Sequence, residues 1–142
     1  MKHFNANDLF EKLIKLTKEN TIQWRYLDDD KSICDELNLR AYKSENIFEI
    51  SLNITSSKAF DVNNSFVAHI NNNYIIICCE KDDSTSNKTL EERLSFMLVP
   101  RTFRGVRVYT SSDDDGTLLR LQSLVKSYFP SADDIIKDIL DM

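Results

Sequence analysis

Glycine and histidine are scarce in this sequence, and each shortage removes a class of site. Gly105 and Gly116 are the only glycines, so a glycine-rich loop that cradles phosphate groups has no residues to build it. His3 and His69 are the only histidines, which leaves the chain poor in the commonest acid-base residue and metal ligand. His69 lies in the pattern SFVAHI and is interpreted as a strand residue held by a neighbour. No G-x-S-x-G nucleophile motif is present. The sequence therefore favours a protein that is not an enzyme.

Cysteine is also rare, and its pattern carries no cofactor chemistry. Cys34, Cys78 and Cys79 form neither an even disulfide framework nor a zinc spacing. Cys78 and Cys79 are neighbours in the run YIIICC, and successive side chains of a strand point to opposite faces. We expect both to be small buried apolar residues. The sequence predicts no cofactor and no metal site.

Long apolar runs are missing as well. No run approaches the roughly 18 residues that a membrane span needs, and the start MKHFNANDLFEKL has no signal-peptide core. The expectation is a soluble cytoplasmic protein. The 23 acidic residues outnumber the 18 basic ones and give a net charge of −5. This balance disfavours nucleic acid as a partner and favours a basic protein surface.

What is present is the composition of one globular domain. Of the 142 residues, 42% are hydrophobic and 29% are charged, which is enough apolar content for a core. Leu9, Phe10, Leu13 and Ile14 predict a helix over about residues 8–19, with Asp8 as its cap and Glu11 completing a capping box. Alternation predicts a strand at 22–26 in which Trp24 anchors the core.

The middle of the chain predicts a curved sheet. After an acidic loop at 28–32, two antiparallel strands are expected at 37–41 and 48–54. The three asparagines at 71–73 predict a tight hairpin between SFVAHI and YIIICCE. Residues 74–79 are apolar on both faces and predict a central strand. Residues 90–98 fit either a helix or a strand, and a strand paired with GVRVYT is favoured.

Two C-terminal helices complete the predicted fold. Leu118, Leu121 and Val125 mark the first, which Pro130 ends. Ser131 and Asp134 begin the second, whose apolar residues share one side and must pack on the domain or on a partner, so a homodimer is one expectation. The fold class is a single α+β domain over 1–142: an N-terminal helix, a mainly antiparallel sheet of about 5–7 strands with helices on one side, and two C-terminal helices.

The acidic triplet at 113–115 is a candidate for part of a calcium-binding loop. With Gly116 at the sixth position of such a loop, Ser111 and Gln122 occupy the two ends, where an aspartate and a glutamate belong. The pattern fails at both ends. The triplet is interpreted as a turn that leads into the helix, where carboxylates meet free N–H groups and the positive end of the dipole.

One basic segment is the candidate binding surface. In PRTFRGVRVY, three arginines recur every third residue with aromatic residues between them. Arginine and aromatic side chains are typical of protein-interaction hot spots and of single-stranded nucleic-acid surfaces, whereas a solvated hairpin whose arginines balance nearby acids is the simpler explanation. The candidate binding residues are Arg101, Phe103, Arg104, Arg107 and Tyr109.

A chain that begins with a helix leading into LTKENTIQWRY and closes with DDDGTLLRLQSLVKSYFPSADDIIKDIL resembles small uncharacterised bacterial proteins of mobile or accessory gene sets. The resemblance covers the two ends of the chain and implies a fold but no activity. The few histidines and glycines, the missing catalytic motifs and the moderately acidic charge lead to the hypothesis of a non-enzymatic protein-binding module of the accessory or immunity type. The alternative is a small metal-dependent hydrolase or nuclease that uses the strand carboxylates Glu49, Asp61 and Glu80.

Overall fold

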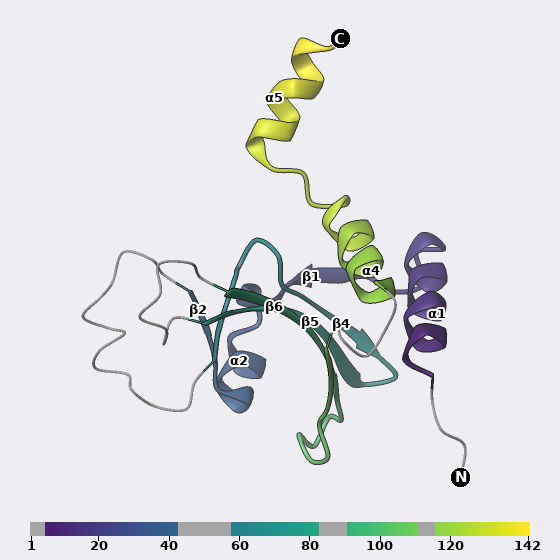
Figure 1. The fold of residues 1–142 in the computed structure, drawn as a ribbon, viewed down its shortest axis with the longest axis vertical. Coiled ribbons are helices and arrows are strands. Elements are labelled where there is room, and N and C mark those ends of the chain that lie inside the picture. Colours follow the sequence, from purple (N-terminus) through teal and green to yellow (C-terminus); the bar gives the residue numbers. More distant parts are fainter. Residues whose placement is uncertain (1–4, 43–57, 83–90, 111–115) are drawn as a thin grey trace, which may run out of the picture.

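The structure is a computed structural model that describes residues 5–42, 58–82, 91–110 and 116–142. Its strands form one curved sheet, and its helices are arranged around that sheet (Figure 1). In chain order the elements are α1 (Ala6–Lys18), β1 (Trp24–Tyr26), the 3-10 turn η1 (Leu27–Asp29), α2 (Lys31–Leu37), β2 (Leu39–Ala41), β3 (Lys58–Phe60), β4 (Phe66–Ile70), β5 (Asn73–Asp82), β6 (Glu91–Val99), β7 (Arg107–Thr110), α4 (Thr117–Lys126) and α5 (Ala132–Leu140).

β5 is the centre of the seven-stranded sheet. On one side it pairs with β6, which in turn pairs with β7. On the other side its first half pairs with β4 and its last residues pair with β3, and these strands carry β1 and β2 at their outer edges. Every pairing is antiparallel except that of β2 with β3. The mixed α+β class, the mainly antiparallel sheet and the N- and C-terminal helices are confirmed.

The β4–β5 hairpin confirms the turn expected from the three asparagines. Asn71 and Asn72 have φ values of 49° and 67°, the left-handed conformation that a two-residue hairpin needs and that asparagine tolerates. Beyond the turn, β5 alternates between two buried faces: Ile75 and Ile77 pack into one cluster, and Ile76 and Cys78 into another. The prediction of a central strand covered on both sides is therefore correct.

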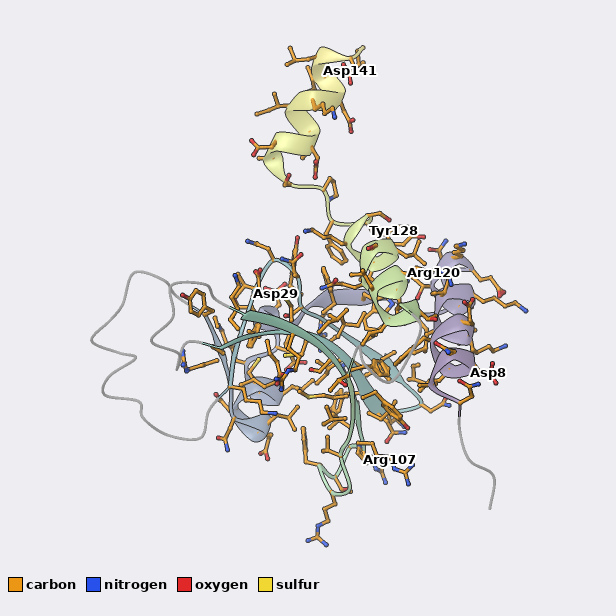
Figure 2. The ribbon with its side chains drawn as sticks, viewed as in Figure 1. Asp8, Asp29, Arg107, Arg120, Tyr128 and Asp141 are labelled. Carbon is orange, nitrogen blue, oxygen red and sulfur yellow. The ribbon has the colours of Figure 1, made fainter. Side chains whose placement is uncertain are left out.

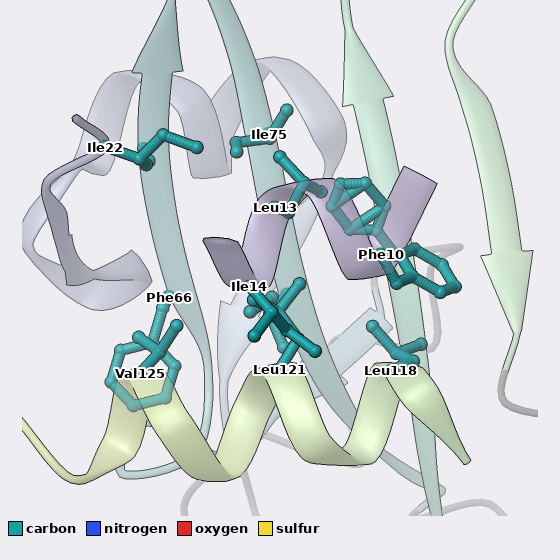
Figure 3. Packing of buried hydrophobic residues seen from close by; sticks show 12 residues of the cluster. Phe10, Leu13, Ile14, Ile22, Phe66, Ile75, Leu118, Leu121 and Val125 are labelled. Atoms are coloured by element: carbon teal, nitrogen blue, oxygen red, sulfur yellow. The ribbon is translucent and has the colours of Figure 1, made fainter. Parts of the chain in front are cut away.

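The first cluster lies between the sheet and the pair α1 and α4. Phe10 from α1 meets the ring of Phe96 from β6 edge to face, with 5.2 Å between centroids. Figure 3 shows Ile14 of α1 beside Leu121 of α4, and Leu13 of α1 beside Ile75 of the sheet. Trp24 packs at the margin of this cluster, and its indole Nε1 donates to Thr17 Oγ1 at 3.0 Å. The predicted core anchor is therefore partly buried and tied to α1.

The second cluster lies on the opposite face, under η1 and α2. Leu27, Ile33 and Cys34 cover it, and they pack against the sheet residues of that face. The expectation that all helices lie on one side of the sheet is wrong, because a short helix covers the second face. α2 has seven residues, too few for its pattern of Ile33, Cys34 and Leu37 to establish a helical period in the sequence.

The structure also differs from the predicted acidic loop at 28–32 and from the predicted strand at 37–41. Asp30 caps α2 by accepting from the backbone N–H of Ile33 at 3.2 Å, so its carboxylate begins a helix. The helix runs to Leu37, and the strand β2 begins only at Leu39. β2 pairs in parallel with β3, whereas an antiparallel partner at 48–54 was expected; residues 48–54 lie outside the described part of the chain.

The first helix is also capped one turn earlier than predicted. The side chain of Asn5 accepts from the N–H of Asn7 at 2.9 Å, and α1 begins at Ala6. Asp8 therefore lies in the first turn and is not the cap, so the capping box with Glu11 is wrong. Asparagine and aspartate are comparable caps, and the sequence alone does not separate positions three residues apart.

At the C-terminal end the predicted helices are present. α4 packs on the first cluster, and α5 begins with the expected capping box between Ser131 and Asp134. Figure 1 shows α5 extending away from the sheet, at the far end of the molecule's long axis. None of its residues is buried, so of the two expected alternatives its apolar side does not pack on the described part of the domain, and packing on a partner stays a prediction. Among the described residues, no helix combines the length and the apolar character of a membrane span.

Candidate binding surface: the arginine hairpin

The basic segment lies where β6 turns into β7. Glu91–Val99 and Arg107–Thr110 pair antiparallel, with Leu98 opposite Arg107 and Met97 opposite Val108. This confirms that the segment at 90–98 forms a strand over its described residues. We call residues 100–108 the arginine hairpin. They close the pair of strands. The turn is fixed by two backbone donors: Phe103 N–H donates to Pro100 O at 2.8 Å, and Arg101 N–H donates to Asn73 Oδ1 at 3.2 Å.

Phe103 holds the tip of this hairpin against the sheet. Its ring stacks on that of Tyr74 in β5, with centroids 5.7 Å apart and 25° between the planes. The ring of Tyr74 in turn meets the His69 ring edge to face at 4.6 Å. Phe103 has a φ of 60°, a conformation that disfavours a bulky side chain. The aromatic contact therefore stabilises a backbone shape that the residue would otherwise avoid.

The three arginines remain exposed around this anchor. Arg101, Arg104 and Arg107 are exposed, and within the described residues none of their guanidinium groups makes an ion pair. Residues 100–110 contain no acidic side chain, so the segment carries a charge of +3 in a chain of −5. Figure 2 shows Arg107 at the end of the molecule opposite α5. The hairpin therefore presents concentrated positive charge, and no counterion for it lies among the residues that the structure describes.

The two aromatic candidates face opposite sides of the sheet. Tyr109 lies over the first cluster and meets the ring of Phe10 at 6.2 Å, edge to face. Phe103 and Val106 pack against the second cluster, and Val108 shares that face because it pairs with Met97. Val108 is 50% exposed. An apolar strip of Phe103, Val106 and Val108 thus lies beside the arginines, whereas Tyr109 is part of the first core.

Near this surface the structure brings together a polar group that the sequence analysis missed. Arg25 of β1 pairs with Asp30, the cap of α2, and its Nη2 also lies 2.9 Å from His69 Nε2. His69 is thus a strand residue with neighbours on both sides, Arg25 and Tyr74. The antiparallel pairing of β1 with β4 creates this contact across 44 residues of sequence, and no local pattern announces it.

The carboxylates that the alternative hypothesis of a hydrolase or nuclease would use do not form a metal site in the described part of the chain. Glu80 pairs with Lys58 at 3.3 Å, and Asp61 lies 3.9 Å from Lys81. Glu80 and Lys81 are successive strand residues, so these two ion pairs occupy opposite faces of the sheet. Glu49 and the triplet 113–115 lie outside the described residues. Among the residues that are described, no three histidine, cysteine or acidic side chains gather as metal ligands would.

The three thiols are buried and reduced. Cys78 and Cys79 are consecutive in β5 and point to opposite faces, as predicted. Burial raises the pKa of Cys34 from 9.0 to about 11, with Asp28 and Asp30 adding to the shift. Burial raises the pKa of Cys78 further, with a smaller contribution from Glu80. Thiols with raised pKa values are poor nucleophiles at neutral pH, so these cysteines belong to the core.

Comparison of the chain with protein-family models, with curated proteins and with solved structures gave no significant match.

Proposed function

We propose that this chain is a non-enzymatic protein-binding module and that the arginine hairpin is its contact surface. The observation that carries the proposal is the group of three exposed arginines without an ion pair among the described residues, placed around a packed aromatic anchor. Arginine next to a rigid aromatic and an exposed apolar side chain is the composition of interaction hot spots. A protein partner satisfies this surface by supplying carboxylates and an apolar patch.

The charge of the hairpin defines what the partner offers there. A net charge of −5 favours a basic partner for the molecule as a whole, but the hairpin itself carries +3. Complementary potentials speed the encounter of two proteins and fix their orientation. The patch that meets the hairpin is therefore acidic, whatever the charge of the rest of the partner.

The hairpin is also preorganised for binding. Its backbone is held by the bonds of Phe103 N–H and Arg101 N–H and by the stack on Tyr74, so little of the loop needs to be ordered on association. Restricting a loop before binding lowers the entropy lost in the complex. This rigidity distinguishes the proposal from that of a solvated loop whose arginines serve solubility alone.

The test is affinity capture from a lysate of the native cell with the wild type beside a variant carrying Arg101→Ala, Arg104→Ala and Arg107→Ala. A matched control carries Lys12→Ala, Lys15→Ala and Lys18→Ala, which removes the same charge from exposed positions of α1. The proposal expects a stoichiometric protein retained by the wild type and the lysine control and lost from the arginine variant. A protein retained equally by all three chains, or by none, would contradict it.

A further inference from the structure

Within the described ranges, large apolar side chains that are exposed gather on one side of α5. Ile135, Ile136, Ile139 and Leu140 share that side at helical spacing, and their exposed fractions are 49%, 53%, 60% and 78%. A helix of nine residues is shorter than those that are stable alone in water, and most helical stability comes from packing an apolar face. A surface that covers the apolar side of α5 is therefore expected to stabilise it.

The charges around this stripe define that surface. Between residues 132 and 141 there are four aspartates against one lysine, a net charge of −3. Asp133 lies three residues before Ile136 and Asp138 three residues after Ile135, so a carboxylate borders the stripe on each side. A surface that fits α5 is thus an apolar strip bordered by positive side chains, and those are the features of the arginine hairpin.

The hairpin that α5 fits belongs to another molecule. In Figure 2, Asp141 and Arg107 lie towards opposite ends of the molecule, and only five residues join α4 to α5. The helix of one copy is therefore far from its own hairpin. Pairing like with like is disfavoured, because two α5 helices bring −3 against −3 and two hairpins bring +3 against +3. The helix and the hairpin attract each other across two copies.

We propose that α5 of one copy docks on the arginine hairpin of a second copy, with Ile135, Ile136, Ile139 and Leu140 against Phe103, Val106 and Val108, and with aspartates beside arginines. Two antiparallel copies make this contact twice and close the assembly. A doubled contact also brings the buried area nearer to that of a stable interface than either contact alone. The inference rests on the proposed function, since the same hairpin receives the helix and the external partner, which then compete.

A pair of charge-reversed chains tests the docking. The first variant carries Arg104→Glu and Arg107→Glu, and the second carries Asp133→Arg and Asp138→Arg. Each variant alone sets like charges against each other, so its self-association is expected to weaken by about tenfold for each reversed pair. In an equimolar mixture the acidic helix of the first meets the basic hairpin of the second, and the basic helix of the second meets the acidic hairpin of the first. The mixture is therefore expected to regain the association of the wild type.

Sedimentation velocity of the full chain from about 10 μM to about 1 mM provides the readout, with the mass of each species measured by light scattering. The matched control carries Lys12→Glu and Lys15→Glu, which changes net charge as the first variant does but at exposed positions of α1. This control is expected to associate as the wild type does. Circular dichroism verifies that every variant is folded.

Two results would overturn the docking. One is a wild-type chain that stays monomeric over the whole concentration range. The other is a hairpin variant that associates as strongly as the wild type, which is expected if α5 pairs with α5. A chain that is monomeric but captures a partner through its arginines leaves the proposed function intact and removes only this inference. Restored association in the mixture, with no partner captured by the wild type, leaves the docking intact and removes the proposed function.

Discussion

Phe103 stacks on Tyr74 while its own backbone lies at a φ of 60°, so a favourable ring contact and an unfavourable backbone conformation occur at one residue. A left-handed conformation costs a residue with a side chain roughly 1–2 kcal/mol, and an aromatic pair returns about 0.5–1.5 kcal/mol. The two effects are of similar size. The ring contact therefore offsets much of the backbone cost at the hairpin tip.

Replacing Phe103 separates the two effects. Phe103→Ala loses the stack and keeps the backbone cost, and we expect it to lower the free energy of unfolding by about 1–2 kcal/mol. Phe103→Gly loses the same stack but relieves the backbone, so it is expected to be the more stable of the two by about 1 kcal/mol. Urea unfolding followed by circular dichroism measures both. Equal stability of the two variants would show that the backbone at this position is not under strain.

Asn72 gives a second test of the left-handed backbone conformation, at an exposed turn residue. Its φ is 67°, and the position after an asparagine in a two-residue hairpin is the one that glycine favours most. Asn72→Gly is expected to raise the free energy of unfolding by about 0.5–1 kcal/mol, and Asn72→Ala to lower it by a similar amount. The urea midpoints of the two variants should therefore fall on either side of that of the wild type.

These two turns show what the sequence does and does not predict. The asparagine hairpin is local: residues 71–73 stand between two apolar runs, and their own conformational preference places the turn. The strain at Phe103 is not local, because it depends on Tyr74, which lies 29 residues earlier in the chain and reaches it through the pairing of β5 with β6. The sequence points to the hairpin's arginines and aromatics as a candidate surface, but only the sheet register separates Phe103 from Tyr109.

The same distinction between local and distant contacts explains the errors in the predicted fold. α2 is too short for a periodic signal, and its cap Asp30 stands in a run of three aspartates that equally resembles a loop. The parallel pairing of β2 with β3 has no sequence signature, because it joins short strands through contacts distant in the chain. Ser131 and Asp134, in contrast, stand at the spacing of a capping box and place the start of α5 correctly.

Thr17 links α1 to the single tryptophan. Its hydroxyl donates to Leu13 O at 2.7 Å and accepts from Trp24 Nε1 at 3.0 Å, and the residue is buried. Thr17→Val keeps the shape but leaves the indole N–H unpaired, which is expected to cost about 1–3 kcal/mol of unfolding free energy. In a Trp24→Phe background the same substitution should cost less, because no indole donor remains. A double-mutant cycle from urea unfolding measures the difference; equal costs in both backgrounds would rule out the bond as their cause.

The buried thiol of Cys34 predicts a loss of stability at alkaline pH. The folded state raises its pKa from 9.0 to about 11, mainly through burial, so the folded protein holds the thiol proton more tightly than the unfolded chain. Its contribution is fully present below pH 9 and is lost as the pH rises towards 11. Cys34 also donates to Leu27 O at 3.4 Å, a bond that ionisation removes. The free energy of unfolding of the wild type should therefore fall relative to that of Cys34→Ala between pH 9 and 11, and parallel curves would exclude the effect.

α5 is capped rather than buried, so its helicity and the stability of the domain respond to different substitutions. Ser131 Oγ accepts from the N–H of Asp134 at 3.2 Å, and Asp134 accepts from the N–H of Ser131 at 3.0 Å. Ser131→Ala is expected to weaken the local helix by about 1 kcal/mol and to leave the unfolding midpoint of a dilute monomer unchanged, because no residue of α5 is buried. Backbone chemical shifts over 132–140 measure the first effect, and urea unfolding measures the second.

The pH dependence of α5 follows from the same cap. The hydrogen bonds from Ser131 lower the pKa of Asp134 below 3.8, because they favour the charged carboxylate. A lowered pKa contributes helix stability above pH 3.8, and that contribution is lost as the pH falls through the lower value. Ser131→Ala removes the hydroxyl partner and should move the acid loss of helicity to higher pH. A midpoint that does not move would show that the cap is not what holds the helix together, and would leave docking on a second copy as its main support.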